Sequence, residues 1–247
     1  MIAEVHRYPD AAAFGLRERI AAEHGVPMDH VIQGNGSNEL LDLAVHTFCR
    51  AELHHLVFAE PAFVVYRIAA LSYGIPFTAV PTRDLTHDLE AMAAAVTPRT
   101  RLVIVANPNN PTGTHVGLDA LRRFLRAVPP EVIVLMDEAY IEYATAGDFP
   151  DAMKLRGERE RLIVCRTFSK IYGLAGLRVG YGVSTPELVS YMNRVRAPFN
   201  VGVLGQAAAI AALDDTEHVR QSRALNTVER ERVTARLTAM GLSLIHI

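Results

Sequence analysis

The stretch that decides the fold is Leu102-Val103-Ile104-Val105-Ala106-Asn107-Pro108-Asn109-Asn110-Pro111-Thr112-Gly113. Its first five residues are all apolar and do not alternate with polar ones, which is typical of a β-strand buried on both faces. The remaining residues are asparagines, prolines, a threonine and a glycine, and most of these types favour turns. The stretch therefore predicts an inner strand of a parallel sheet that ends in a polar loop.

Two further apolar runs, at residues 132–136 and 162–165, repeat this pattern. Around these runs, apolar residues recur at three- and four-residue spacing, which predicts amphipathic helices. Alternation of such strands and helices favours a sheet with helices on both faces. We therefore expect an α/β protein with three layers, α/β/α, and a mostly parallel central sheet. Helices are expected near residues 39–49, 63–74, 118–125, 207–213 and 216–239.

The composition narrows the classes of protein to which the chain can belong. Half of the 247 residues are apolar and 21% are charged, so the chain can bury a large core and is not a disordered or fibrous protein. The formal net charge of −2 gives no reason to expect a nucleic-acid or membrane partner. Two cysteines are too few for a disulfide framework, the histidines show no metal-ligand spacing, and no apolar run approaches the ~18–20 residues of a membrane helix. The expected location is the cytoplasm.

Polar groups follow each predicted strand, where parallel sheets collect their ligands. Residues 107–113 follow the first run, and Asp137-Glu138-Ala139-Tyr140 follows the second. Arg166-Thr167-Phe168-Ser169-Lys170 follows the third, with Arg178 shortly beyond. One crevice would therefore collect an amide, a carboxylate, a phenol, hydroxyls, an amine and a guanidinium.

This set of groups suits pyridoxal phosphate, which offers an aldehyde, a pyridine nitrogen, a ring hydroxyl and a phosphate. Lys170 would form a Schiff base with the aldehyde. Asp137 would pair with the ring nitrogen and keep it protonated, because a nearby opposite charge favours the charged form. Asn110 and Tyr140 could both donate to the ring oxygen. The catalytic residues expected on this hypothesis are Lys170, Asp137 and Tyr140.

The phosphate and the ring face would need further partners. Ser169 and Arg178 would hold the phosphate, the arginine through a charge-assisted fork. Upstream, a glycine-rich turn precedes the helix expected from Glu39, and the first N–H groups of such a helix are free to bind an anion. Ser37 and Asn38 could supply those amides, and Phe63 could stack on the pyridine ring.

Each of these features has a plain structural explanation when it is taken alone. A Gly-Asn-Gly turn is usually only a turn, and an Asn-Pro cluster can be a loop without a ligand. Asp137 could be only a helix cap, and most lysines are simply solvated. A residue such as Phe63 is more often core than a stacking platform, and Tyr66 is expected in the core or at an interface. The cofactor hypothesis depends on four motifs occurring together, in order, at successive strand ends.

The chain resembles the fold-type I pyridoxal-phosphate aminotransferases, and among them the class-II enzymes of the histidinol-phosphate group. Residues 110–113 are similar to the family's Asn-Pro-Thr-Gly loop, and Asp137 with Tyr140 is similar to its Asp-x-x-Tyr motif. Ser169-Lys170 with Arg178 eight residues on resembles the family's Schiff-base signature. The resemblance runs from Arg7 to about Leu242.

Further features resemble the histidinol-phosphate branch. Arg7-Tyr8-Pro9-Asp10 is similar to a segment whose tyrosine reaches the cofactor phosphate of a neighbouring subunit, which implies that Tyr8 binds the cofactor across a homodimer. Thr167 matches a further hydroxyl near the phosphate, and Phe63 stands where many members carry tyrosine. The implied domains are an N-terminal arm at 1–25, a large cofactor-binding domain at 26–212, and a linking helix with the first strand of a small domain at 213–247.

The apolar run at the end of the chain has no partner strand after it, so we expect truncation at both ends. The arginines that hold the substrate carboxylate in this family would then lie beyond residue 247. The resemblance implies transamination of L-histidinol phosphate with 2-oxoglutarate, giving imidazole-acetol phosphate and glutamate. Alternatives are an aromatic-amino-acid aminotransferase, a phosphothreonine decarboxylase, or the cofactor-binding module of a regulator. The implied partners are a small-molecule amino donor and a 2-oxo acid.

Overall fold

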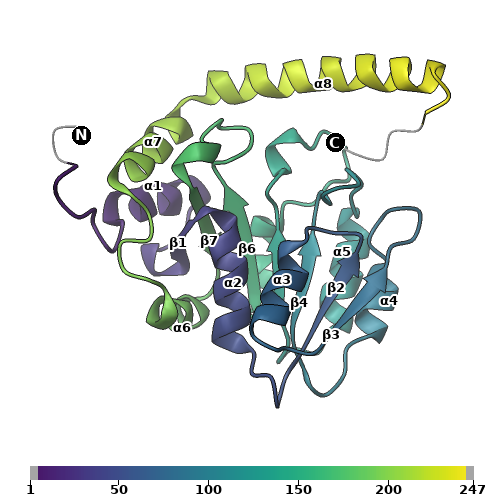
Figure 1. The fold of residues 1–247 in the computed structure, drawn as a ribbon, viewed down its shortest axis with the longest axis horizontal. Helices are drawn as coiled ribbons and strands as arrows, with labels where there is room; N and C mark the ends of the chain where they lie inside the picture. Colours follow the sequence, from purple (N-terminus) through teal and green to yellow (C-terminus); the bar gives the residue numbers. More distant parts are fainter. Residues whose placement is uncertain (1–4, 243–247) are drawn as a thin grey trace.

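The computed structural model describes residues 5–242, and these form a seven-stranded sheet between two layers of helices (Figure 1). The strand order is β1-β7-β6-β5-β4-β2-β3. Neighbours from β3 to β6 are parallel, whereas β7 is antiparallel to both β6 and β1. The expected three-layer, mostly parallel fold is confirmed. The strands are β1 (Val31–Asn35), β2 (His55–Glu60), β3 (Phe77–Pro81), β4 (Thr100–Ala106), β5 (Ile133–Asp137), β6 (Leu162–Thr167) and β7 (Val179–Val183).

Helices cover both faces of the sheet. Side chains of α1, α4, α5 and α7 join the core on one face, and those of α2, α3 and α6 join the core on the other. Helix α8 runs along the top of Figure 1, and none of its side chains is buried. The α-helices are α1 (Phe14–His24), α2 (Gly36–Phe48), α3 (Val65–Ser72), α4 (Leu89–Ala94), α5 (Leu118–Ala127), α6 (Pro186–Val195), α7 (Val203–Asp214) and α8 (Thr216–Ala239), and the 3₁₀ turns are η2 (Met28–His30), η3 (Ile141–Tyr143), η4 (Ala152–Glu158) and η5 (Ala175–Leu177).

The position of β4 inside the sheet explains why its residues 102–106 are all apolar. Val103 and Val105 pack into the core under α4 and α5, while Leu102 and Ile104 pack into the core under α2 and α3. Successive side chains of a strand point to opposite faces, so a strand covered on both sides needs apolar residues at every position.

Helix α2 begins three residues earlier than expected, at Gly36 rather than Glu39. The N–H of Gly36 donates to the carbonyl oxygen of Arg178 on the adjoining segment, at 3.0 Å. This long-range bond anchors the first turn of the helix, and short-range spacing in the sequence cannot reveal it. Ser37 and Asn38 therefore belong to the first turn of α2.

Some expectations are not tested by the described residues. The strand expected at the end of the chain includes residues 243–247, which lie outside the described part, so this element stays a prediction, as does the division at 1–25, 26–212 and 213–247. Helix α8 does match the helix expected at 216–239. No helix in residues 5–242 is both long enough and apolar enough to cross a membrane.

Candidate active site

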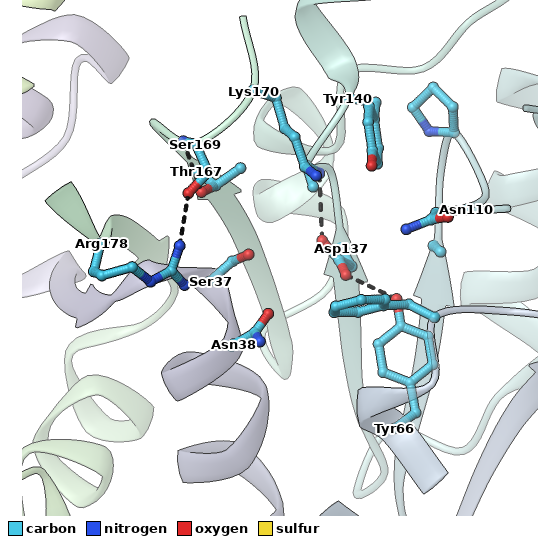
Figure 2. Close-up of a pocket in the computed structure, with 14 residues that line it drawn as sticks. Ser37, Asn38, Tyr66, Asn110, Asp137, Tyr140, Thr167, Ser169, Lys170 and Arg178 are labelled. Carbon is cyan, nitrogen blue, oxygen red and sulfur yellow. Dashed lines mark hydrogen bonds between the residues drawn. The ribbon is translucent and has the colours of Figure 1, made fainter. Parts of the chain in front are cut away.

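A cavity of about 220 Å³ lies where β4, β5 and β6 end, beside the first turn of α2 (Figure 2). Tyr8 is the one expected site residue that does not line it: its side chain is 82% exposed and stacks on Phe199, with ring centroids 4.7 Å apart. A contact between Tyr8 and a neighbouring subunit stays a prediction. The expected residues that do line the cavity are Ser37, Asn38, Phe63, Asn110, Asp137, Tyr140, Thr167, Ser169, Lys170 and Arg178.

Asp137 is the last residue of β5 and is 5% exposed. Its carboxylate accepts hydrogen bonds from the Tyr66 hydroxyl at 2.8 Å and from the Ala139 N–H at 3.3 Å. Burial raises the pKa of the carboxyl, while these two hydrogen bonds and the charge of Lys170 act in the opposite direction. Burial dominates because a carboxylate loses much of its hydration there. The site therefore holds a buried acid that a cation in the cavity would stabilise in its charged form.

Tyr66 is a further site residue, although the sequence pattern placed it only in the core or at an interface. Its ring is fully buried on α3, yet its hydroxyl reaches Oδ2 of Asp137 and the residue lines the cavity. Burial raises the pKa of the phenol well above its ordinary value, so the hydroxyl stays protonated and can only donate to the carboxylate. The sequence offers one hint, the three-residue spacing from Phe63, whose ring it meets edge-on at 6.0 Å.

Lys170 lies in the loop after β6, and its side chain extends into the cavity between Asp137 and Tyr140 (Figure 2). Its Nζ lies 4.9 Å from the centre of the Tyr140 ring. Asn110, from the loop after β4, lines the same side of the cavity as Tyr140 in this view. An amine, a carboxylate, a phenol and an amide therefore converge from three separate strand ends.

A second group of residues forms a cradle suited to an anion. Arg178 adopts the left-handed conformation, with φ 52°, and its guanidinium donates to the Ser169 hydroxyl at 3.3 Å. A Cβ at Gly36 would lie 2.3 Å from this guanidinium, and a Cβ at Gly180 would lie 2.4 Å from the backbone nitrogen of Ser37. Glycine at both positions thus lets the start of α2 approach Arg178 closely.

The polar groups of the cradle come from the start of α2, from the end of β6 and from the segment between β6 and β7. Ser37 and Asn38 lie in the first turn of α2, where backbone N–H groups have no partner within the helix. Thr167 ends β6, and its hydroxyl accepts from the Ser169 N–H at 3.1 Å. A helix N-terminus, a guanidinium and two hydroxyls together make a site for a phosphate or a similar anion.

Comparison with known proteins agrees with this geometry. The histidinol-phosphate aminotransferase of Moorella thermoacetica is 49% identical over 239 residues, which cover 96% of this chain and 62% of that protein. Histidinol-phosphate aminotransferase 2 of Pseudomonas aeruginosa is 49% identical over 244 residues, which cover 99% of this chain and 66% of that protein. The chain therefore spans less than two thirds of the length of these curated relatives.

The chain is also similar in fold to a solved histidinol-phosphate aminotransferase. The histidinol-phosphate aminotransferase of Sinorhizobium meliloti, in complex with pyridoxal-5'-phosphate, superposes with a TM-score of 0.92 at 30% identity, over 98% of this chain and 66% of that chain. The family described as aminotransferase class I and II matches residues 1–246. On this match, on the related sequences and on the shared fold, the chain belongs to the class I and II aminotransferases.

Proposed function

We propose that the protein is a pyridoxal-phosphate-dependent aminotransferase that transfers the amino group of L-histidinol phosphate to 2-oxoglutarate. One observation carries the proposal: the Lys170 amine, the buried Asp137 carboxylate and the Arg178 cradle line a single cavity. The names of the relatives support histidinol phosphate as amino donor, and the cofactor in the S. meliloti protein supports pyridoxal phosphate. The acceptor, 2-oxoglutarate, is the one that the resemblance to the histidinol-phosphate branch implies.

The residues of the cavity fit this cofactor. Asp137 is buried and its two hydrogen-bond donors, Tyr66 and Ala139, are both neutral, so a protonated pyridine nitrogen would add a directly paired cation to the nearby charge of Lys170. The close approach of α2 to Arg178 suits a phosphate group. Phe63 supplies an aromatic ring at the cavity wall, on which a pyridine ring can stack.

When bound, pyridoxal phosphate supplies an electron sink for the negative charge that develops on the α-carbon of the amino donor. Asp137 keeps the positive charge on the ring nitrogen, and Tyr66 orients the carboxylate by donating to its Oδ2. Asn110 and Tyr140 donate to the ring oxygen. Nζ of Lys170, once neutral, would act as the general base that takes the proton from the α-carbon of the amino donor and delivers it to the carbon of the cofactor aldehyde.

The remaining cavity residues hold the phosphate. Ser37 and Asn38 offer backbone N–H groups, Thr167 and Ser169 offer hydroxyls, and Arg178 offers its guanidinium. These contacts lie away from the reacting atoms, so they bind and orient without taking part in proton transfer. Arg178 and Asp137 would thus hold a bound cofactor at its phosphate and its ring nitrogen, and Lys170 would be left to react with the aldehyde.

A homodimer in the cytoplasm is part of the proposal. Val64, which caps α3, and Ile68 and Leu71 on that helix form an apolar stripe and are 58%, 51% and 63% exposed. Their spacing of four and three residues puts them on one side of the helix, where a second copy can cover them. Tyr8 is exposed as well, as a residue that reaches a neighbouring subunit must be.

Substrate choice is tested by offering the purified protein histidinol phosphate, phenylalanine or phosphothreonine, each with 2-oxoglutarate. We expect glutamate formation to be fastest with histidinol phosphate. Faster turnover of phenylalanine would favour the aromatic-amino-acid alternative, and carbon dioxide release from phosphothreonine would favour the decarboxylase. Borohydride reduction with added cofactor, followed by peptide mapping, should label Lys170, and a label elsewhere would contradict its assigned role.

A further inference from the structure

Behind the cavity, a buried arginine connects the strands that carry the site. Arg166 lies on β6 and is 9% exposed. Its Nε and Nη2 both donate to Oε2 of Glu138, at 3.0 and 2.8 Å, and Nη2 also donates to Asp151 at 2.6 Å. Glu138 directly follows β5 and is 1% exposed, and its other oxygen accepts from the Ala152 N–H at 2.8 Å.

This ion pair lies on the face of the sheet opposite the cavity. Cys165 pairs in register with Asp137 and packs into the core under α2 and α3, the same core that contains Tyr66. Because side chains alternate along a strand, Arg166 points to the other face. There it is in register with Tyr181 of β7, whose side chain belongs to the core of that face. The pair therefore adds no contact to the cavity itself.

The ion pair nevertheless joins two of the elements that bring the cavity residues together. Asp137 immediately precedes Glu138, and Lys170 follows Arg166 by four residues. The neighbour of Tyr181 is Gly180, the residue that admits the start of α2. The salt bridge thus links the ends of β5 and β6 on the face of the sheet opposite the Asp137 carboxylate. Arg166 is paired with two carboxylates, those of Glu138 and Asp151, on the face away from the cavity, so we take its effect on the site to be one of position.

We propose that Glu138 and Arg166 are positioning residues, which hold the Asp137 carboxylate at the cofactor ring nitrogen and in register with Lys170. This inference rests on the proposed function and deepens it, because it assigns a role to two residues that touch neither cofactor nor substrate. A buried ion pair is in itself a weak contributor to stability, and replacing both partners with uncharged residues is often tolerated. Position and stability can therefore be separated by experiment.

The test compares Arg166→Met with the double variant Glu138→Gln/Arg166→Met. The single variant leaves an unpaired buried carboxylate, and its melting temperature should fall by on the order of 10 °C. The double variant removes the buried charges of both residues and leaves only the partly exposed Asp151 carboxylate without its partner, so it should recover most of that loss. Arg122 and Glu158 form a matched control, an ion pair at 2.7 Å with both side chains more than a third exposed, and Arg122→Met/Glu158→Gln should melt within about 2 °C of the wild type.

The decisive readouts are the dissociation constant for pyridoxal phosphate, measured on the cofactor-free variants, and the pH midpoint of the visible absorption band of the loaded protein. In the folded double variant we expect affinity to fall about tenfold or more and the midpoint to move by about half a pH unit, with no change in the control. Wild-type values for both quantities would overturn the proposal. If the double variant does not fold, Arg166→Lys, which keeps the charge but lacks the fork, carries the same test with the same two outcomes. A wild-type protein that binds no pyridoxal phosphate would instead overturn the proposed function, and this inference with it.

Discussion

Gly180→Ala should weaken cofactor binding through a steric effect at the backbone. An alanine Cβ at this position of β7 would lie 2.4 Å from the backbone nitrogen of Ser37, 2.6 Å from the carbonyl carbon of Gly36 and 3.1 Å from the carbonyl oxygen of Arg166. Favourable contacts between such atoms lie at roughly 3.5–4.0 Å. All three neighbours are backbone atoms and cannot rotate away, so the first turn of α2 must move by about 1 Å.

This displacement sets the size of two effects, a loss of thermal stability and a loss of cofactor affinity. Overpacking of a well-packed region costs about 1–3 kcal/mol, which lowers the melting temperature of a chain of this length by about 2–12 °C. A hydrogen bond of about 2.9 Å that lengthens by about 1 Å is lost. Because a hydrogen bond to a charged group contributes about 1.5–3 kcal/mol, losing one from the Ser37 amide to the phosphate should raise the dissociation constant about 10- to 150-fold.

The assay is a thermal melt with equilibrium binding of pyridoxal phosphate and of inorganic phosphate. Gly182→Ala is the matched control on the same strand, because a Cβ there meets only side-chain atoms, the nearest being Cγ2 of Ile32 at 3.2 Å. We expect Gly182→Ala to bind both ligands almost as the wild type does. The reasoning would be refuted if Gly180→Ala kept wild-type affinity for both ligands, whatever its melting temperature.

Three further variants probe the cavity itself. Lys170→Ala should abolish transamination and the adduct trapped by borohydride, measured by glutamate release and peptide mapping. Tyr66→Phe removes a donor from the buried carboxylate, so the pKa of Asp137 should rise further and the affinity for pyridoxal phosphate should fall about tenfold, measured by titration. Burial raises the folded-state pKa of Asp137, so in the cofactor-free protein its stabilising effect is present at low pH and is lost as the pH rises through that pKa. Asp137→Asn should therefore melt above the cofactor-free wild type near neutral pH but bind pyridoxal phosphate more weakly; a variant that melts lower at every pH would contradict this.

The elements of the fold could be predicted where the chain carries its own signal. The apolar runs of β4, β5 and β6 are buried on both faces, and such strands need no information from distant residues to be recognised. The start of helix α2 could not be predicted. Its first turn contains Gly36, a weak helix former with φ 72°, and depends on a hydrogen bond to Arg178 far along the chain. Nor do local patterns reveal that β7 runs antiparallel to both of its neighbours, β1 and β6.

In the candidate site, too, some residues could be predicted from the sequence and others could not. Residues at or shortly after the end of a strand, such as Asp137 and Lys170, could be assigned to one crevice because parallel strands bring their carboxyl ends to one edge. Tyr66 could not, because it lies in the first turn of α3 and its hydroxyl reaches the site only through the packing of that helix on the sheet. The roles of the cavity residues toward the cofactor stay predictions that the variants above test.

Local sequence was enough to establish which chemical groups gather at the sheet edge, because residue spacing sets where each strand ends and which side chains come next. How those groups face one another depended instead on the packed fold. The hydrogen bond from Tyr66 to Asp137, the approach of α2 permitted by Gly180, and the ion pair of Arg166 with Glu138 all join segments far apart in the chain. Such contacts depend on packing of the whole core, in which each position is set by many distant neighbours at once.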